Sequence, residues 1–121
     1  MAFVRGIRGA ITVERNNSEE IGAATKELLQ TIAERNQLDL EDVVSVFFTV
    51  TEDLTASYPA KAAREIGWHN VPLFSALEPP IEGALPRCIR ILVHVNTGKS
   101  QQEIKHVFLR EAACLRPDLA G

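Results

Sequence analysis

Arginines are the residues of this chain best suited to binding a charged ligand. They make up nine of its 13 basic residues, which stand beside 16 acidic residues. A planar guanidinium donates paired hydrogen bonds to a carboxylate or a phosphate, which the point charge of a lysine does with less directional control. This composition favours a small acidic ligand. The alternative is that the arginines form ordinary ion pairs on the surface.

Two of these arginines interrupt predicted strands. Arg90 stands among apolar residues of the segment 88–96, so we expect its guanidinium to be partly buried and to need an anion. Arg8 lies in an amino-terminal strand, on the opposite face from Arg5, because side chains alternate along a strand.

Further cations occur elsewhere in the chain. Lys61 and Arg64 are three residues apart, which places them on one face of a predicted helix, and Arg116 is held extended by the proline that follows it. If these cations converge with Arg8 and Arg90, they form a pocket for a ligand with two negative charges. The open alternative is that each pairs with a structural acid.

Other kinds of site chemistry have little support in the sequence. Its three histidines, at positions 69, 94 and 106, lie far apart and join no zinc-binding or Gly-x-Ser-x-Gly pattern. The segment 5–9 contains two glycines but lacks the spacing and the Lys-Ser/Thr end of a phosphate-binding loop. We therefore predict no metal site and no nucleotide cofactor.

Charge and cysteine content restrict the partners and the compartment. The net charge of −3 argues against nucleic acid as the main partner. Cys88 and Cys114 are too few for a disulfide framework, so we expect a reducing compartment and two buried packing residues. No export signal precedes Arg5, and the longest apolar run, 43–50, is far too short to span a membrane. These features predict a cytoplasmic protein that does not contact membranes.

The pattern of apolar residues predicts the elements that must position the candidate residues. Period-2 alternation indicates strands, helical spacing behind the N-cap residue Asn17 indicates one long helix, and Ser100 begins a capping box. The segment 43–50 is apolar on both faces, as in a buried central strand. The expected order is strand 3–13, helix 18–36, strand 43–50, helix 59–67, strand 71–77, loop 78–83, strand 88–96, short helix 100–106 and strand 107–115. This order predicts one α/β (α+β) domain, residues 1–121, with five strands, one long helix and two short ones.

Several separated motifs resemble those of the monofunctional trimeric chorismate mutases, the AroH class. The match runs from end to end: Arg-Gly-Ile-Arg-Gly-Ala-Ile-Thr-Val-Glu-Arg at 5–15, Thr-x-Asp-Leu at 51–54, Tyr-Pro-Ala-Lys-Ala-x-Arg at 58–64, Cys-Ile-Arg at 88–90, His-Val-Phe-Leu at 106–109 and Leu-Arg-Pro-Asp-Leu at 115–119. The resemblance implies a mixed sheet with helices on one face, assembled as a homotrimeric pseudo-α/β barrel with active sites between subunits. It also implies the Claisen rearrangement of chorismate to prephenate in aromatic amino acid biosynthesis, with no cofactor and no metal.

The resemblance implies a role for each candidate residue. Arg90 would donate to the breaking ether oxygen, Arg8 would bind a carboxylate, and Glu78 would accept from the substrate hydroxyl. The expected substrate-binding residues are Ser75 and Phe108, then Tyr58, Ala60, Lys61 and Arg64 from a neighbouring subunit, and Leu73, Phe74, Leu115 and Arg116 at the rim and tail.

Three positions depart from the pattern of that family. Ser75 stands where many members have cysteine, and Tyr58 where phenylalanine is usual. Phe108 stands where members typically have tyrosine, so one hydrogen bond to a substrate carboxylate is lost, which predicts weaker binding rather than inactivity.

Two other functions stay open at this point. A trimeric imine deaminase of similar fold would also use an interfacial arginine for a small carboxylate, although that family's carboxyl-terminal signature is absent. A non-catalytic trimeric sensor of chorismate-like metabolites would bind the same ligand without turnover.

Overall fold

The computed structural model of the protein describes residues 2–115. Its strands and α-helices are β1 (Phe3–Thr12), α1 (Ser18–Asn36), β2 (Val43–Val50), α2 (Pro59–Glu65), β3 (Leu73–Leu77), β4 (Cys88–Thr97) and β5 (Val107–Leu109). Short 3-10 helices occupy Leu40–Asp42, Trp68–Asn70, Gln101–Glu103 and Arg110–Cys114. The predicted order of elements is confirmed.

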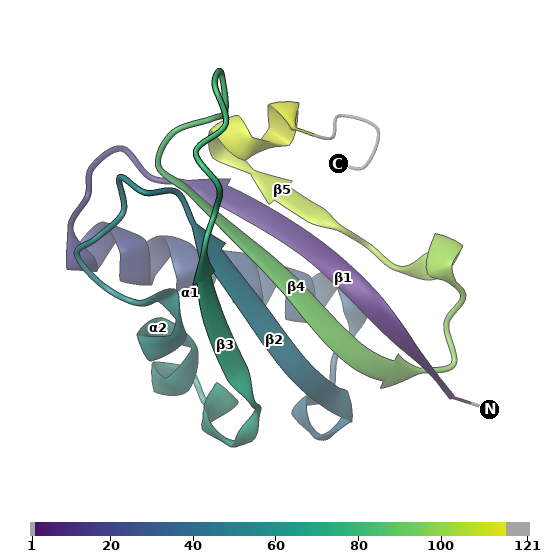
Figure 1. Cartoon of the computed structure of the whole chain (residues 1–121). Helices are drawn as coiled ribbons and strands as arrows, with labels where there is room; N and C mark the ends of the chain where they lie inside the picture. Colours follow the sequence, from purple (N-terminus) through teal and green to yellow (C-terminus); the bar gives the residue numbers. More distant parts are fainter. Residues whose placement is uncertain (1, 116–121) are drawn as a thin grey trace.

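The five strands form one mixed sheet in the order β3-β2-β4-β1-β5 (Figure 1). Strand β4 lies at the centre and pairs antiparallel with both β1 and β2. The outer strands β3 and β5 run parallel to their neighbours, β2 and β1. The expected mixed five-stranded sheet is confirmed, and Arg90 lies on its central strand.

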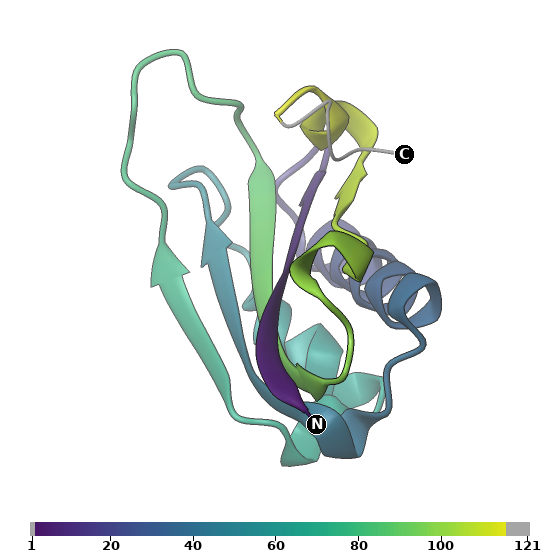
Figure 2. The same cartoon turned by 90° about the vertical axis from the view of Figure 1, so that its right-hand side faces the viewer.

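Helix α1 packs against one face of this sheet because its apolar side chains form a single stripe. Asn17 caps its start by accepting a hydrogen bond from the backbone N–H of Glu20 at 2.8 Å. The stripe, which is fully buried, consists of Ile21, Ala24, Leu28, Leu29 and Ile32. Both α-helices lie on the same side of the sheet (Figure 2), so the core forms between helices and sheet.

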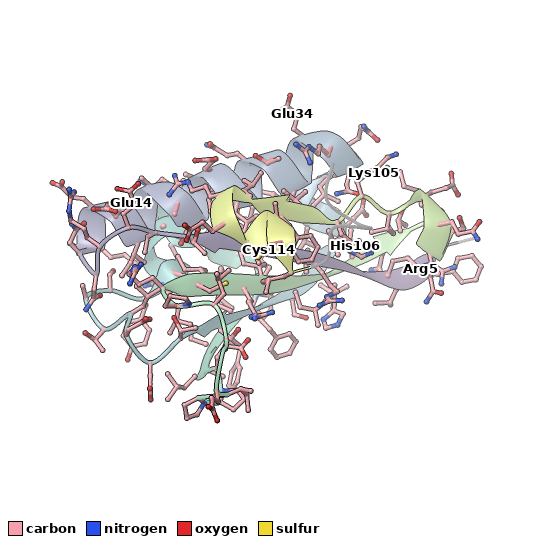
Figure 3. All side chains as sticks on the ribbon, turned by 90° about the horizontal axis from the view of Figure 1, so that it is seen from above. Arg5, Glu14, Glu34, Lys105, His106 and Cys114 are labelled. Carbon is pink, nitrogen blue, oxygen red and sulfur yellow. The ribbon has the colours of Figure 1, made fainter. Side chains whose placement is uncertain are left out.

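Within residues 2–115, no helix lies over the opposite face of the sheet. Seen from above, α1 forms one layer, with Glu34 on its outer side, and side chains on the far face of the sheet project into open space (Figure 3). On that face Phe47 is 39% exposed and Phe74 is 60% exposed. We expected β2 to be covered on both faces. For the part of the chain that the structure describes, that expectation is wrong, because no second layer of these residues covers the far face.

The carboxyl-terminal segment differs from the predicted strand 107–115. Strand β5 ends at Leu109, and Arg110–Cys114 forms a 3-10 helix instead. Arg110 has a φ of 56°, which a continuing strand cannot accommodate. The turn is held to β1, because Arg110 Nη1 donates to the carbonyl oxygen of Thr12 and the N–H of Glu111 donates to its hydroxyl. Similarly, the expected helix 100–106 is only the capped turn Gln101–Glu103.

The two cysteines lie in different environments. Cys88 is buried, and burial raises the pKa of its thiol to about 11, which keeps it protonated and unreactive at neutral pH. Cys114 is exposed, so the expectation that both cysteines are buried is wrong for Cys114. Cys114 is exposed because it lies in the 3-10 helix Arg110–Cys114. In the predicted strand, every second side chain would have pointed into the sheet's packed face.

No helix within residues 2–115 is long and apolar enough to cross a membrane.

Gly9 lies on β1 in close contact with side chains of α1, and this contact gives a first prediction. A Cβ at position 9 would come within 2.8 Å of Ile32 Cδ1 and 3.3 Å of the Val107 carbonyl oxygen. Gly9→Ala should therefore lower the free energy of unfolding by about 1–2 kcal/mol, since the packed core yields only partly. Denaturant unfolding followed by circular dichroism measures this change.

Gly22→Ala is the matched control. A Cβ at this helical position would meet nothing within 4 Å, so this substitution should stabilise the protein by up to about 1 kcal/mol. Equal unfolding curves for Gly9→Ala and the unsubstituted protein would show that α1 can move away from the sheet at no cost.

Candidate active site

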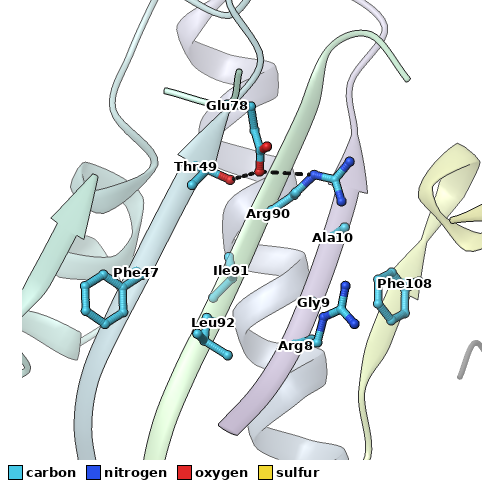
Figure 4. A pocket seen from close by; sticks show the side chains of 10 residues that line it. All are labelled: Arg8, Gly9, Ala10, Phe47, Thr49, Glu78, Arg90, Ile91, Leu92 and Phe108. Atoms are coloured by element: carbon cyan, nitrogen blue, oxygen red, sulfur yellow. Dashed lines mark hydrogen bonds and ion pairs between the residues drawn. The ribbon is translucent and has the colours of Figure 1, made fainter. Parts of the chain in front are cut away.

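The uncovered face of the sheet carries two adjacent rows of side chains that run across the strands. One row contains Phe108, Ala10, Arg90 and Thr49, which pair in register on β5, β1, β4 and β2. The next row contains Arg8, Leu92, Phe47 and Phe74, which pair on β1, β4, β2 and β3. Alternation along each strand places both rows on one face. All residues of the two rows except Phe74 line a pocket of about 290 Å³ (Figure 4).

Arg90 and Glu78 form an ion pair at one end of this pocket. The Nε atom of Arg90 lies 3.3 Å from Oε1 of Glu78, and the two side chains are 32% and 25% exposed. This Nε atom is buried and has no hydrogen bond within the described residues, because the carboxylate lies at ion-pair distance without the geometry of a hydrogen bond. A buried donor left in this state indicates a site made for another acceptor.

Hydrogen bonds between the loop after β2 and the start of β4 hold the strand that carries Arg90. The Thr51 hydroxyl donates to Asp53 at 2.6 Å and accepts from the N–H of Cys88, two residues before Arg90. Asp53 in turn accepts from the N–H of Arg87. The Thr51-x-Asp53 motif is therefore structural, and it ties the loop after β2 to the start of the strand that carries Arg90.

Arg8 forms the second cationic group of the pocket. It is a diagonal neighbour of Arg90, since it pairs with Leu92 on β4. Its Cζ atom lies 5.9 Å from the centre of the Phe108 ring, within cation–π range. The backbone N–H of Arg8 donates to Nδ1 of His106 at 2.9 Å. These contacts fix both the main chain and the side chain of Arg8 on the pocket wall.

The ring of Phe108 is held by a small apolar cluster at the carboxyl-terminal end of the pocket. This cluster is separate from the main core and consists of Ala10, Cys88, Phe108 and Ala112, with Leu85 and Leu115 packed against it. Leu115 packs against this cluster but does not itself line the pocket, so its contact with a substrate stays a prediction. Arg116 lies outside the described residues.

The pocket can bind a small anion without covalent chemistry. Among the described residues, two arginines and one carboxylate give the lining one net positive charge. The described lining residues include no cysteine, serine, histidine or lysine that could act as a nucleophile or a base. Within residues 2–115, no three His, Cys, Asp or Glu side chains are grouped closely enough to hold a metal ion. The arrangement suits the orientation and electrostatic stabilisation of a bound carboxylate.

The structure does not bring the remaining predicted residues to this pocket within one chain. Ser75 and Tyr58 line a second pocket, of about 510 Å³, beside the edge strand β3. Ser75 pairs with the buried Phe48, so alternation turns it to the face opposite Phe47. On one chain, Ser75 and Tyr58 therefore lie apart from the predicted residues Arg8, Glu78, Arg90 and Phe108.

Helix α2 carries three more of the predicted residues. Lys61 and Arg64 are exposed, whereas Ala60 is buried and packs in the main core. Of the two residues expected at the rim, Phe74 is exposed beside Phe47, with ring centres 5.8 Å apart, and Leu73 packs partly against the core. None of these residues lines the Arg90 pocket.

Sequence reasoning missed Thr49 and Ala10, which line the pocket next to Arg90. Ala10 supplies open space between Arg90 and Phe108, since a larger side chain in that row would fill the floor. The signal for both was period 2 combined with strand register, because each pairs directly with Arg90. Register depends on which strands are neighbours, and no local pattern in the sequence specifies that.

Comparisons with known proteins all find chorismate mutases that match this chain over nearly its whole length. A family model described as chorismate mutase type I matches residues 4–119. The chain is 56% identical over 118 residues to chorismate mutase AroH from Thermus thermophilus, with 97% of each chain covered. It is 48% identical over 119 residues to chorismate mutase AroH from Bacillus subtilis, with 98% of this chain and 94% of that protein covered.

A solved structure is similar over nearly the same length. The chorismate mutase from Clostridium thermocellum matches with a TM-score of 0.89 at 46% sequence identity, covering 91% of this chain and 98% of that one.

Proposed function

The chain belongs to the chorismate mutase type I family, and from this membership we propose that the pocket around Arg90 rearranges chorismate to prephenate. The enzyme is an isomerase of aromatic amino acid biosynthesis. One observation carries the assignment to this pocket: the Nε atom of Arg90 is buried and has no hydrogen-bond partner among the described residues. Two further charged side chains, Arg8 and Glu78, line the same pocket. A ligand oxygen can complete the hydrogen bonding of the Nε atom.

The rearrangement needs no nucleophile and no proton transfer, because one C–O bond breaks as one C–C bond forms within the same molecule. The protein must hold a flexible dianion in its compact reactive conformer and stabilise charge that develops on the ether oxygen. Arg90 donates to that oxygen and to a carboxylate. Arg8 binds a carboxylate, and Glu78 accepts from the substrate hydroxyl and faces the positive charge of the ring.

The charge of the pocket supports a site completed by a second copy of the chain. One net positive charge does not balance a dianion, and Lys61 and Arg64 are exposed on α2, away from this pocket. We propose a homotrimer in which Tyr58, Ala60, Lys61 and Arg64 of a neighbouring subunit form the second wall, with Ser75, Leu73 and Phe74 near the junction. The open sheet face, where Phe47 and Phe74 are exposed, is the surface that such an assembly covers.

The cysteines support a cytoplasmic location, which we also propose. Cys88 and Cys114 are both free thiols. Free thiols persist in a reducing compartment.

Replacement of Arg90 tests the function and the site together. Arg90→Ala should lower kcat by at least about 10²–10³-fold, because one preorganised donor to the transition state is lost. The assay follows the decrease in chorismate absorbance with purified protein, in the presence of a chelator and without added cofactor. Arg15→Ala is the control, since its side chain is 75% exposed in a surface ion pair, and it should retain full activity.

The same assay can contradict the proposal. Near-native turnover by Arg90→Ala would remove Arg90 from the mechanism. Binding of chorismate without turnover by the unsubstituted protein would instead favour a metabolite sensor.

Phe108→Tyr tests the effect of having phenylalanine where the family typically has tyrosine, next to the arginine that is proposed to bind a carboxylate. The added hydroxyl restores a neutral hydrogen-bond donor beside Arg8, so KM should fall about two- to tenfold while kcat changes little. Steady-state kinetics measure both constants, and thermal unfolding checks that the apolar cluster around position 108 tolerates the hydroxyl. An unchanged KM would mean that position 108 does not contact a substrate carboxylate.

A mixing experiment tests whether each site is shared between subunits. Arg90→Ala and Arg64→Ala should each be nearly inactive alone, yet mixed trimers contain some sites with both arginines. Random assembly at equal amounts restores about one quarter of the sites. Light scattering should give a mass of about three chains. Mixtures that regain no activity after unfolding and refolding together would contradict a shared site.

A further inference from the structure

Among the described residues that line the pocket, Thr49 is the one polar side chain without a proposed role in the rearrangement. It lies on β2 and pairs in register with Arg90 on β4, so both side chains stand on the same face of the sheet. Its Oγ1 donates a hydrogen bond to Oε1 of Glu78 at 2.5 Å. Figure 4 shows Thr49 and Arg90 on either side of this single carboxylate oxygen.

The contact has the geometry of a strong hydrogen bond. An ionised carboxylate only accepts, so the hydroxyl of Thr49 is the donor. A separation of 2.5 Å between the two oxygens lies at the short end of the range for hydrogen bonds to a charged acceptor. The β-branched side chain of Thr49 has few rotamers on a strand, so the donor is held rigidly on a paired strand.

Glu78 needs such a support because of its place in the chain. It is the first residue after β3, at the start of the loop that leads to β4, and two prolines follow it. Its backbone N–H donates to the carbonyl oxygen of Val50 at 2.8 Å. Consecutive residues of β2 thus hold Glu78 twice, Val50 through the main chain and Thr49 through the side chain. Without the second contact, a glutamate side chain has wide rotamer freedom.

We propose that Thr49 is a positioning residue for the rearrangement, because its hydroxyl holds the Glu78 carboxylate in place beside Arg90 before the substrate binds. This inference rests on the proposed function of the pocket. Both contacts use Oε1 of Glu78, so the carboxylate and the guanidinium keep a fixed relation across β2 and β4. Preorganised charges of this kind lower the reorganisation required in the transition state.

Two substitutions of Thr49 test the role of the hydroxyl. Thr49→Val keeps the branched shape but removes the donor, and should lower kcat/KM about tenfold, chiefly through kcat. Thr49→Ser keeps the donor and should restore activity to within about threefold of the unsubstituted enzyme. Thr97→Val is the matched control, since Thr97 lies at the far end of β4 and does not line the pocket. It should retain full activity.

A double-mutant cycle tests whether Thr49 acts through Glu78. Thr49→Val should cost little further activity in a Glu78→Ala background, because the carboxylate that it orients is already absent. Losses that multiply in the double variant would overturn the inference. So would a Thr49→Val enzyme with unchanged kcat/KM, or a Thr49→Ser enzyme as impaired as Thr49→Val.

Thermal unfolding of each variant separates positioning from stability. Thr49→Val should melt close to the unsubstituted protein, since position 49 is only half-buried and valine suits a strand. A loss of activity that merely tracked a loss of folded protein would overturn the positioning role. If the unsubstituted protein does not turn over chorismate, the proposed function itself fails and Thr49 has no such role. If it does, an unchanged Thr49→Val refutes the role of Thr49 alone.

Discussion

The ion pair between Arg90 and Glu78 is the interaction around which the rest of the pocket is arranged. A guanidinium on the central strand of a sheet loses much of its hydration, and an acidic partner must offset that loss. Glu78 supplies this partner from the loop after β3 and is held at two points of β2. The Nε atom of Arg90 still has no hydrogen bond within the described residues, so one buried donor of the pair is open to a further acceptor.

This arrangement requires a sheet with two unlike faces. One face packs against α1 and forms the core, in which Gly9 permits the close approach of helix and sheet. The other face presents Arg8, Arg90 and Phe108. Because alternate residues of a strand point to opposite sides, β1, β2, β4 and β5 each contribute both to the core and to the pocket. Covering both faces with helices of the same chain would close the pocket.

A rearrangement within one molecule depends chiefly on accurate positions of the charged side chains around the substrate. It requires a fixed conformer and well-placed charges, and both are best supplied by residues on paired strands. Arg8, Arg90 and Thr49 meet this condition directly. Glu78 stands on a loop and depends on its hydrogen bonds to β2. The Thr51-x-Asp53 motif serves the same end by fixing the start of β4.

The amino-acid sequence by itself determined the order of elements and the long capped helix, and it indicated Arg90 and Arg8 as candidate anion-binding residues, because periodicity and a charge within an apolar strand are local properties. Its motifs also indicated the family. Local pattern failed at 107–115, where contacts of Arg110 and Glu111 with Thr12 replace the end of a strand by a turn.

Only the tertiary structure decided which side chains meet. The strand order β3-β2-β4-β1-β5 places Thr49, Arg90, Ala10 and Phe108 in one row, although they are up to 98 residues apart, the separation of Ala10 and Phe108. It also turns Ser75 away from that row. Such pairings depend on the register of strands that are distant in the sequence, and register is set by the packing of the whole sheet against α1 rather than by any neighbouring residue.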